Sequence, residues 1–98
     1  MGIAIIVQDQ AHRRVEIIAG EAAEVLHETV SNAPPKSLMR GVHPHGDTMF
    51  NSVQLRDLLA EIDAISPRGQ AETDLIATLR VAIEAAIRHR GYLWFSGD

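Results

Sequence analysis

The segment 92–95 (YLWF), close to the carboxyl terminus, constrains the fold of this chain most strongly. It holds three of the four aromatic residues of the sequence. A segment this apolar is unfavourable in water, so we expect it to dock as a strand within a sheet. Residues 3–8 (IAIIVQ) and 14–19 (RVEIIA) are short and rich in β-branched side chains, which predicts two more strands joined by a loop over 9–13.

Helical patterns fill most of the remaining chain. Residues 21–30 predict a short helix, which the prolines at 34 and 35 bring to an end. Asn51, followed three residues later by Gln54, predicts the N-cap of a second helix. A longer helix is predicted over about residues 70 to 90, with Gly91 as a typical residue just beyond its end.

The stretch 43–51 (HPHGDTMFN) predicts a hairpin between the first two helices. Proline at the second position and glycine at the fourth are typical of a type I turn, so Asp47–Phe50 would return as a strand. The expected fold is therefore α+β: an antiparallel sheet of about four or five strands with three helices packed on one face. The expected order is β-β-α-β-β-α-α-β, in one domain spanning residues 1–98.

Composition narrows the possible functions. The net charge is −4 and is spread evenly, without the basic stripe that nucleic-acid binding needs. Cysteine is absent, which excludes disulfides, thiolate catalysis and cysteine-bound zinc and fits a reducing compartment. No segment approaches the ~20 apolar residues of a membrane span, and no signal peptide is recognisable. We therefore expect a cytoplasmic protein that binds neither nucleic acid nor membrane.

A metal site is the sharpest chemical hypothesis. His43, His45 and Asp47 alternate along the chain, and in an extended strand their side chains would share one face as ligands for zinc or iron. The string resembles the His-x-His-x-Asp-His signature of metallo-β-lactamase-fold hydrolases, but Thr48 replaces the last histidine and that fold needs about twice this length. A turn at Pro44 would also point His45 away, so we favour a plain hairpin with a His43–Asp47 pair.

Other residues are weaker candidates for a functional site. Arg40 with His43 and His45 could bind a small anionic ligand, and Trp94 could be a stacking platform or, more commonly, an interface anchor. The acidic residues Asp57, Glu61 and Asp63 fit a solvated helix face. We expect no bound cofactor and, unless the alternative at His43, His45 and Asp47 holds, no metal; the sequence contains neither a phosphate loop nor a nucleophile elbow.

Two short segments of the sequence resemble a group of known proteins. The segment 46–51 (GDTMFN) with Gln54, and the ending 92–98 (YLWFSGD), are similar to a loosely defined group of small, uncharacterised bacterial proteins. The resemblance implies a bacterial, cytosolic protein and brings no activity with it. In that group the residue before Pro44 tends to be acidic and position 45 aromatic, so His43 and His45 depart from the pattern, which further weakens the metal hypothesis.

The leading functional hypothesis is a non-enzymatic protein-interaction or regulatory module that self-associates as a homodimer. The first strand is apolar on both faces, and three helices on one face of a sheet would leave apolar side chains on the other face. The candidates for that exposed face are Ile3, Ile5, Val7, Tyr92 and Trp94. The alternatives are a small metal-dependent hydrolase using His43, His45 and Asp47, and the anion binder described above.

Overall fold

The computed structural model describes residues 3–18, 22–43 and 45–97. Within these ranges the chain forms four strands, three α-helices and one short 3-10 helix. Their bounds are β1 (Ala4–Gln8), β2 (Arg14–Ile18), α1 (Ala22–Ser31), the 3-10 helix η1 (Met39–Gly41), β3 (Asp47–Phe50), α2 (Ser52–Asp63), α3 (Gln70–Arg88) and β4 (Tyr92–Ser96). Among these helices, none combines the length and the apolar character that a membrane crossing requires.

The strands form one antiparallel sheet in the order β2-β1-β4-β3. The first and last strands of the chain are thus its central pair, which explains why both are so apolar: a central strand has neighbours on both edges and is the most buried part of a sheet. The predicted α+β class, with an antiparallel sheet and three helices, is confirmed, and the sheet has four strands.

The segment before β3 differs from the hairpin that we predicted. Residues 39–41 form η1, and β3 pairs with β4 instead of with a strand that precedes it. The carboxylate of Glu61 accepts the backbone N–H groups of Leu38 and Met39 at 2.9 and 3.1 Å, so these donors are not available to a strand partner. The predicted type I turn depends on Pro44, which lies outside the described residues.

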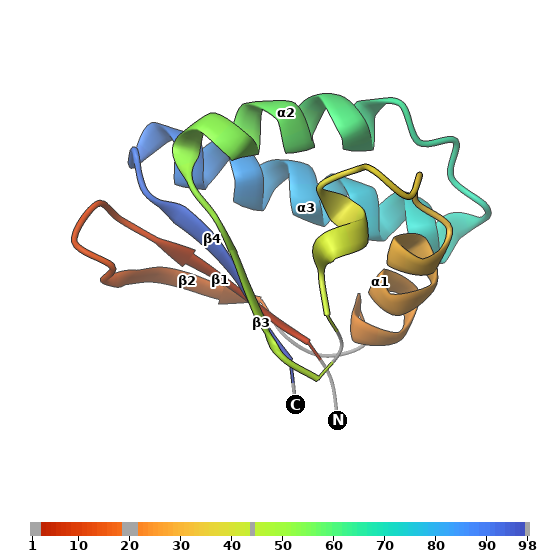
Figure 1. Ribbon diagram of the computed structural model, residues 1–98, viewed down its shortest axis with the longest axis horizontal. Helices are drawn as coiled ribbons and strands as arrows, with labels where there is room; N and C mark the ends of the chain where they lie inside the picture. Colours follow the sequence, from red (N-terminus) through yellow and green to blue (C-terminus); the bar gives the residue numbers. More distant parts are fainter. Residues whose placement is uncertain (1–2, 19–21, 44, 98) are drawn as a thin grey trace.

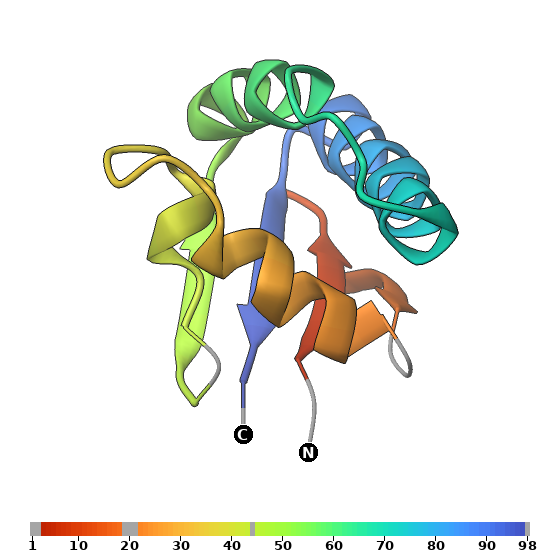
Figure 2. The same ribbon diagram turned by 90° about the vertical axis from the view of Figure 1, so that its right-hand side faces the viewer.

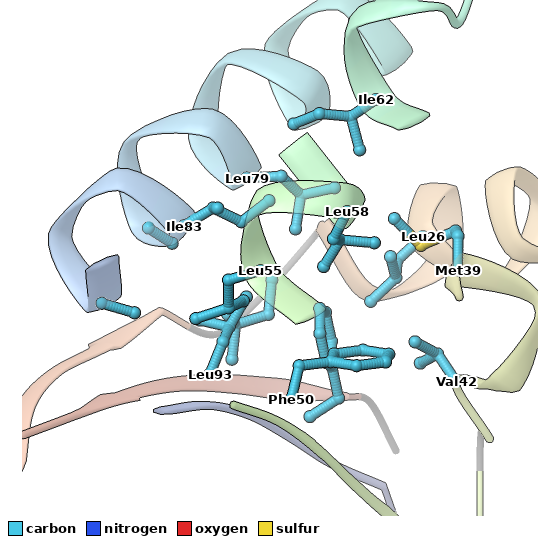
Figure 3. Close-up of a cluster of buried hydrophobic side chains, with 14 of the residues drawn as sticks. Leu26, Met39, Val42, Phe50, Leu55, Leu58, Ile62, Leu79, Ile83 and Leu93 are labelled. Carbon is cyan, nitrogen blue, oxygen red and sulfur yellow. The ribbon is translucent and has the colours of Figure 1, made fainter. Parts of the chain in front are cut away.

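All three helices lie on one face of the sheet, as predicted (Figures 1 and 2). Leu93 and Phe95 of β4 point toward them and are fully buried. The register pairs Phe95 with Ile5 and Leu93 with Val7, so these residues of β1 share the helix-covered face. The core formed there includes Leu55, Leu58 and Ile62 of α2 and Leu79 and Ile83 of α3 (Figure 3).

This register corrects part of the expected exposed face. Ile3, Ile5 and Val7 were candidates for the uncovered side, but all three are buried in the helix-side core. Only some of the five candidates were expected on the uncovered side, and these three are not among them; the sequence does not reveal which face of a doubly apolar strand meets the helices. Tyr92 and Trp94 do lie on the opposite face, since they alternate with Leu93 and Phe95 along β4.

Helix α3 ends at Arg88, two residues before its predicted end, and the left-handed residue beyond it is at position 90 instead of 91. The helix closes with a Schellman motif, in which the Gly91 N–H donates to Ala86 O and the Arg90 N–H donates to Ile87 O, both at 2.9 Å. The residue with left-handed conformation is Arg90, at φ 52°, and Gly91 follows it. Gly91 is required for a different reason, which is the close approach of the backbone at the end of β1.

Candidate functional site

The face of the sheet opposite the helices, called here the outer face, carries one continuous apolar row. Ile6 pairs with both Ile17 and Trp94, and Trp94 pairs with Met49. Directly paired residues point to the same side of a sheet, so these four side chains cross β2, β1, β4 and β3 in line. Ile17 is 50% exposed and Met49 is 42% exposed, while Ile6 between its neighbours is only 5% exposed.

Polar side chains border the row on the side of the β1–β2 loop. Gln8 pairs with Tyr92 across the central strands. The ring of His12 stacks on Tyr92 with 4.1 Å between centroids, and His12 Nδ1 lies 3.1 Å from Gln8 Oε1. His12 reaches this position from a left-handed backbone conformation at φ 61°. The hairpin loop therefore folds over one end of the outer face and leaves the apolar row uncovered.

Two opposite charges lie at diagonal corners of the outer face. A register shift after Val7 makes Arg14 the partner of Gln8, which places Arg14 on the edge strand β2 at the Tyr92 end. Asp47 pairs with Ser96 and lies on the other edge strand, β3, at the far end of the sheet. Both residues are exposed. The outer face thus combines an apolar centre with one positive and one negative corner.

Hydrogen bonds connect the described residues on either side of position 44. His43 Nδ1 accepts the backbone N–H of His45 at 3.0 Å, and the two rings meet edge to face with 6.2 Å between centroids. Thr48 ties the loop together, since its Oγ1 accepts from His43 N and donates to Gly41 O. Among the described residues, no three histidine or acidic side chains gather as metal ligands would. His43, His45 and Asp47 are all exposed.

Arg40 has a structural role away from the histidines. Its Nη1 donates to the carbonyl oxygens of Ser31 and Ala33, at 3.1 and 2.9 Å. These carbonyls belong to the last residue of α1 and to the segment beyond it, where the helix dipole favours a positive charge. The Nη1 of Arg40 is therefore engaged at the C-terminal end of α1.

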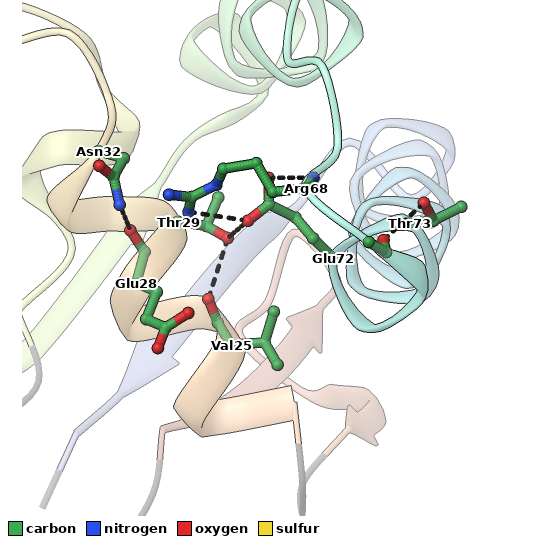
Figure 4. A network of polar contacts seen from close by, with 8 residues as sticks. Val25, Glu28, Thr29, Asn32, Arg68, Glu72 and Thr73 are labelled. Atoms are coloured by element: carbon green, nitrogen blue, oxygen red, sulfur yellow. Dashed lines mark hydrogen bonds and ion pairs between the residues drawn. The ribbon is translucent and has the colours of Figure 1, made fainter.

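A buried carboxylate lies on the helical side of the molecule. Glu72 has a side chain only 6% exposed, and its Oε2 accepts from Arg68 Nη2 at 3.0 Å and from Thr29 Oγ1 at 3.1 Å (Figure 4). The hydroxyl of Thr29 also lies 2.9 Å from Val25 O, but one proton serves only one acceptor at a time. Hydrogen bonding from Arg68, followed by that from Thr29, holds the pKa of Glu72 below its ordinary value and outweighs the opposing effect of burial.

Sequence reasoning missed this cluster and the role of Glu61. The spacing of Arg68 and Glu72, four residues apart, was the available signal for their ion pair. Thr29 is 43 residues from Glu72, so no local pattern connects them. Glu61, expected on a solvated helix face, instead binds the backbone at the start of η1.

No family model, curated protein or solved structure matches this chain. The resemblance of its two short segments to small bacterial proteins therefore stays a prediction.

Proposed function

We propose that this chain is a non-enzymatic protein-interaction module that forms a homodimer through its outer face. The observation that carries the proposal is the apolar row that crosses all four strands opposite the helices. Soluble monomers rarely expose a contiguous apolar surface, and such a surface usually marks contact with a partner. A second, similar sheet face is a suitable cover, because paired sheets interdigitate their inner side chains.

The charges of the outer face favour a second copy of the chain as the partner. The whole chain carries a net charge of −4, which by itself makes two copies repel. On the outer face, however, Arg14 and Asp47 balance one another. A locally neutral face on an acidic protein suits a copy of itself better than a strongly basic or strongly acidic partner.

The diagonal placement of these charges suggests how the two copies are related. Closed dimers are generally two-fold symmetric, so each contact between two different residues occurs twice in the interface. In this dimer the two-fold axis lies between the two sheets and is parallel to them. It runs along the diagonal of the outer face that does not join Arg14 to Asp47. Rotation about this axis makes the strands of the two sheets cross at a large angle. In that arrangement Arg14 lies over Asp47 of the partner subunit, and the reciprocal pair forms at the opposite corner. Near-orthogonal crossing is one of the two common ways in which sheets pack.

The size of the face sets the expected strength of association. Four strands about 4.8 Å apart and five residues long cover roughly 19 by 16 Å. The contact area therefore lies well below the ~800 Å² per partner of a standard stable interface. We expect a weak, reversible dimer with a dissociation constant in the roughly micromolar range or above. The resemblance to small bacterial proteins supports a bacterial cytoplasm as the setting.

Sedimentation equilibrium of three variants tests the proposal. Ile17→Lys and Met49→Lys each place a charge in the apolar row, on exposed positions of the edge strands where the fold tolerates it. Because each substitution occurs twice in a two-fold dimer, we expect dimer dissociation to become easier by at least roughly tenfold. Val81→Lys is the matched control, since Val81 is equally apolar and 60% exposed but lies on α3.

The wild type and Val81→Lys should give masses that rise with concentration from 10.7 kDa toward twice that value. The two row variants should remain at 10.7 kDa over the same range, with unchanged far-UV circular dichroism. A wild type that stays monomeric at millimolar concentration would exclude the dimer. Equal association of all four proteins would assign it to another surface.

A further inference from the structure

A cavity of about 360 Å³ opens on the helical side of the molecule, where it is separate from the outer face. Its walls come from the C-terminal ends of α1 and α2, from the segment 32–39 and from the loop that leads into α3. Figure 4 shows the part of this region around Thr29, Arg68 and Glu72. The volume lies at the lower end of the ~300–1,000 Å³ typical of small-molecule sites, so the cavity suits a compact ligand.

The charges that line this cavity favour a cation. Two acidic residues, Glu61 and Glu72, contribute to the lining. Among the described residues of the lining, one is basic, and this is Arg68. Arg68 is already bonded to Glu72 at 3.0 Å. The oxygens of Glu61 accept only the backbone N–H groups of residues 38 and 39, and no basic side chain forms an ion pair with it within the described ranges. The charge of Glu61 therefore has no positive counterpart in the cavity.

The C-terminal ends of α1 and α2 add negative potential at the cavity, whereas the N-terminal end of α3, next to Glu72, adds a positive one. Helices α1 and α2 both end at its rim, and the C-terminal end of a helix carries a partial negative charge. Arg40 compensates the end of α1 through its bonds to Ser31 O and Ala33 O. The end of α2 is closed by backbone hydrogen bonds from Ala64 and Ile65, which bring no charge. A cation near Glu61 would therefore be attracted by both the carboxylate and the end of α2.

Apart from the charged groups, the lining has a polar part and an apolar part. The polar part is Thr29, Asn32, Ser37 and Ser66, of which the first three already donate to protein oxygens. The apolar part is formed by Ala33, Pro34, Met39, Ala64 and Ile65. Aliphatic and thioether groups of this kind favour a short hydrocarbon body and offer little to a polar or multiply charged ligand. The ligand that fits the charged and the apolar parts of the lining has one positive group and a small aliphatic remainder.

We propose that this cavity binds a primary alkylammonium group, with the ammonium donating to Glu61 and the alkyl chain lying against Met39 and Ile65. An ammonium has three donors, and Glu61 keeps lone pairs that the backbone of η1 does not use. The bond between them is of the stronger, charge-assisted kind. The same group can come from a free amine or from a lysine side chain of a protein.

The test is a titration of the uniformly ¹⁵N-labelled full chain, followed by NMR. The probes are n-butylamine, as its ammonium at neutral pH, and Nα-acetyl-lysine-methylamide, with n-butanol and butyrate as neutral and anionic analogues. We expect saturable shifts at residues around the cavity, with a dissociation constant in the roughly millimolar range for a ligand of this size. Tighter binding of the lysine derivative would identify a protein side chain as the natural source, and tighter binding of butylamine a free amine.

Three variants separate the site from general charge effects. Glu61→Gln keeps an acceptor for η1 but removes the charge, and we expect at least roughly tenfold weaker binding. Ala64→Leu fills part of the cavity from an exposed position and should also weaken binding. Asp57→Asn removes the same charge from an exposed position of α2 outside the lining, and it should bind as the wild type does.

Some results would overturn the ammonium site. These are equal binding of butanol or butyrate, the absence of saturable shifts, and unchanged affinity in a folded Glu61→Gln variant. Met49→Lys, which disrupts the proposed dimer, should bind butylamine as the wild type does because Met49 is remote from the cavity lining. The site and the dimer can therefore fail independently of one another.

Discussion

At the scale of single residues, the junction between α3 and β4 has opposite requirements at two adjacent positions. Arg90 has a left-handed conformation that glycine adopts at lower cost, so we expect Arg90→Gly to stabilise the fold by about 0.5–1 kcal/mol. A Cβ at Gly91 would run into Gln8 O and would come within 2.8 Å of Asp9 Cα, so Gly91→Ala should cost roughly 2 kcal/mol or more. Urea unfolding measures both changes. A neutral Gly91→Ala would show that the backbones are further apart.

The buried carboxylate of Glu72 predicts a pH dependence of stability. Its pKa in the folded chain is lowered from 4.5, chiefly by the hydrogen bond from Arg68, so the unfolded chain binds the proton more readily. The contribution of Glu72 to stability is therefore complete above pH 4.5 and is lost as the pH falls through the folded-state value. Glu72→Gln should lower the free energy of unfolding by about 1 kcal/mol at pH 7, with a gap that narrows below pH 4.5.

The control for this pH effect is Glu84→Gln, which changes an exposed carboxylate on the same helix. We expect its unfolding midpoint in urea to follow that of the wild type at each pH. A gap between the wild type and Glu72→Gln that stays constant from neutral to acid pH would contradict the assigned ion pair.

At the scale of elements, the start of α2 depends on a reciprocal cap. The Asn51 side chain accepts the backbone N–H of Gln54 at 2.9 Å, and the Gln54 side chain accepts the backbone N–H of Asn51 at 3.0 Å. Asn51→Ala removes one of these bonds and should cost about 1 kcal/mol of stability. The chemical midpoint of unfolding measures it, with Asn32→Ala as a comparison outside any N-cap. A loss for Asn51→Ala no larger than that of the comparison would mean that the cap contributes little.

Among these elements, the sequence predicted features that depend on local patterns and missed features that depend on contacts with distant residues. The cap at Asn51 is a local pattern, and the structure confirms it. The 3-10 helix η1 was missed because it is fixed by Glu61, which lies more than twenty residues further along the chain. The exposed row was predicted only in part, since an apolar strand such as β1 does not reveal which of its faces meets the helices. That face is decided by the register with β4.

At the scale of the whole molecule, the diagonal charges make a reciprocal prediction. Arg14→Asp and Asp47→Arg should each weaken the dimer, because each places like charges together twice in a two-fold arrangement. The double variant should recover much of the lost affinity, measured by sedimentation at low salt. Additive loss in the double variant would exclude the crossed arrangement but not the apolar contact itself.

The most direct test of self-association through the outer face is a dilution series of the ¹⁵N-labelled wild type from about 1 mM to about 10 µM, followed by NMR. The NMR signals of the Trp94 indole N–H, which is the single indole of the chain, and of the Ile17 and Met49 amides should shift with concentration. The amide signals of Val53 and Val81, which lie on the exposed side of the helices, should not shift. Spectra that do not change with dilution, or shifts confined to α2 and α3, would contradict the account.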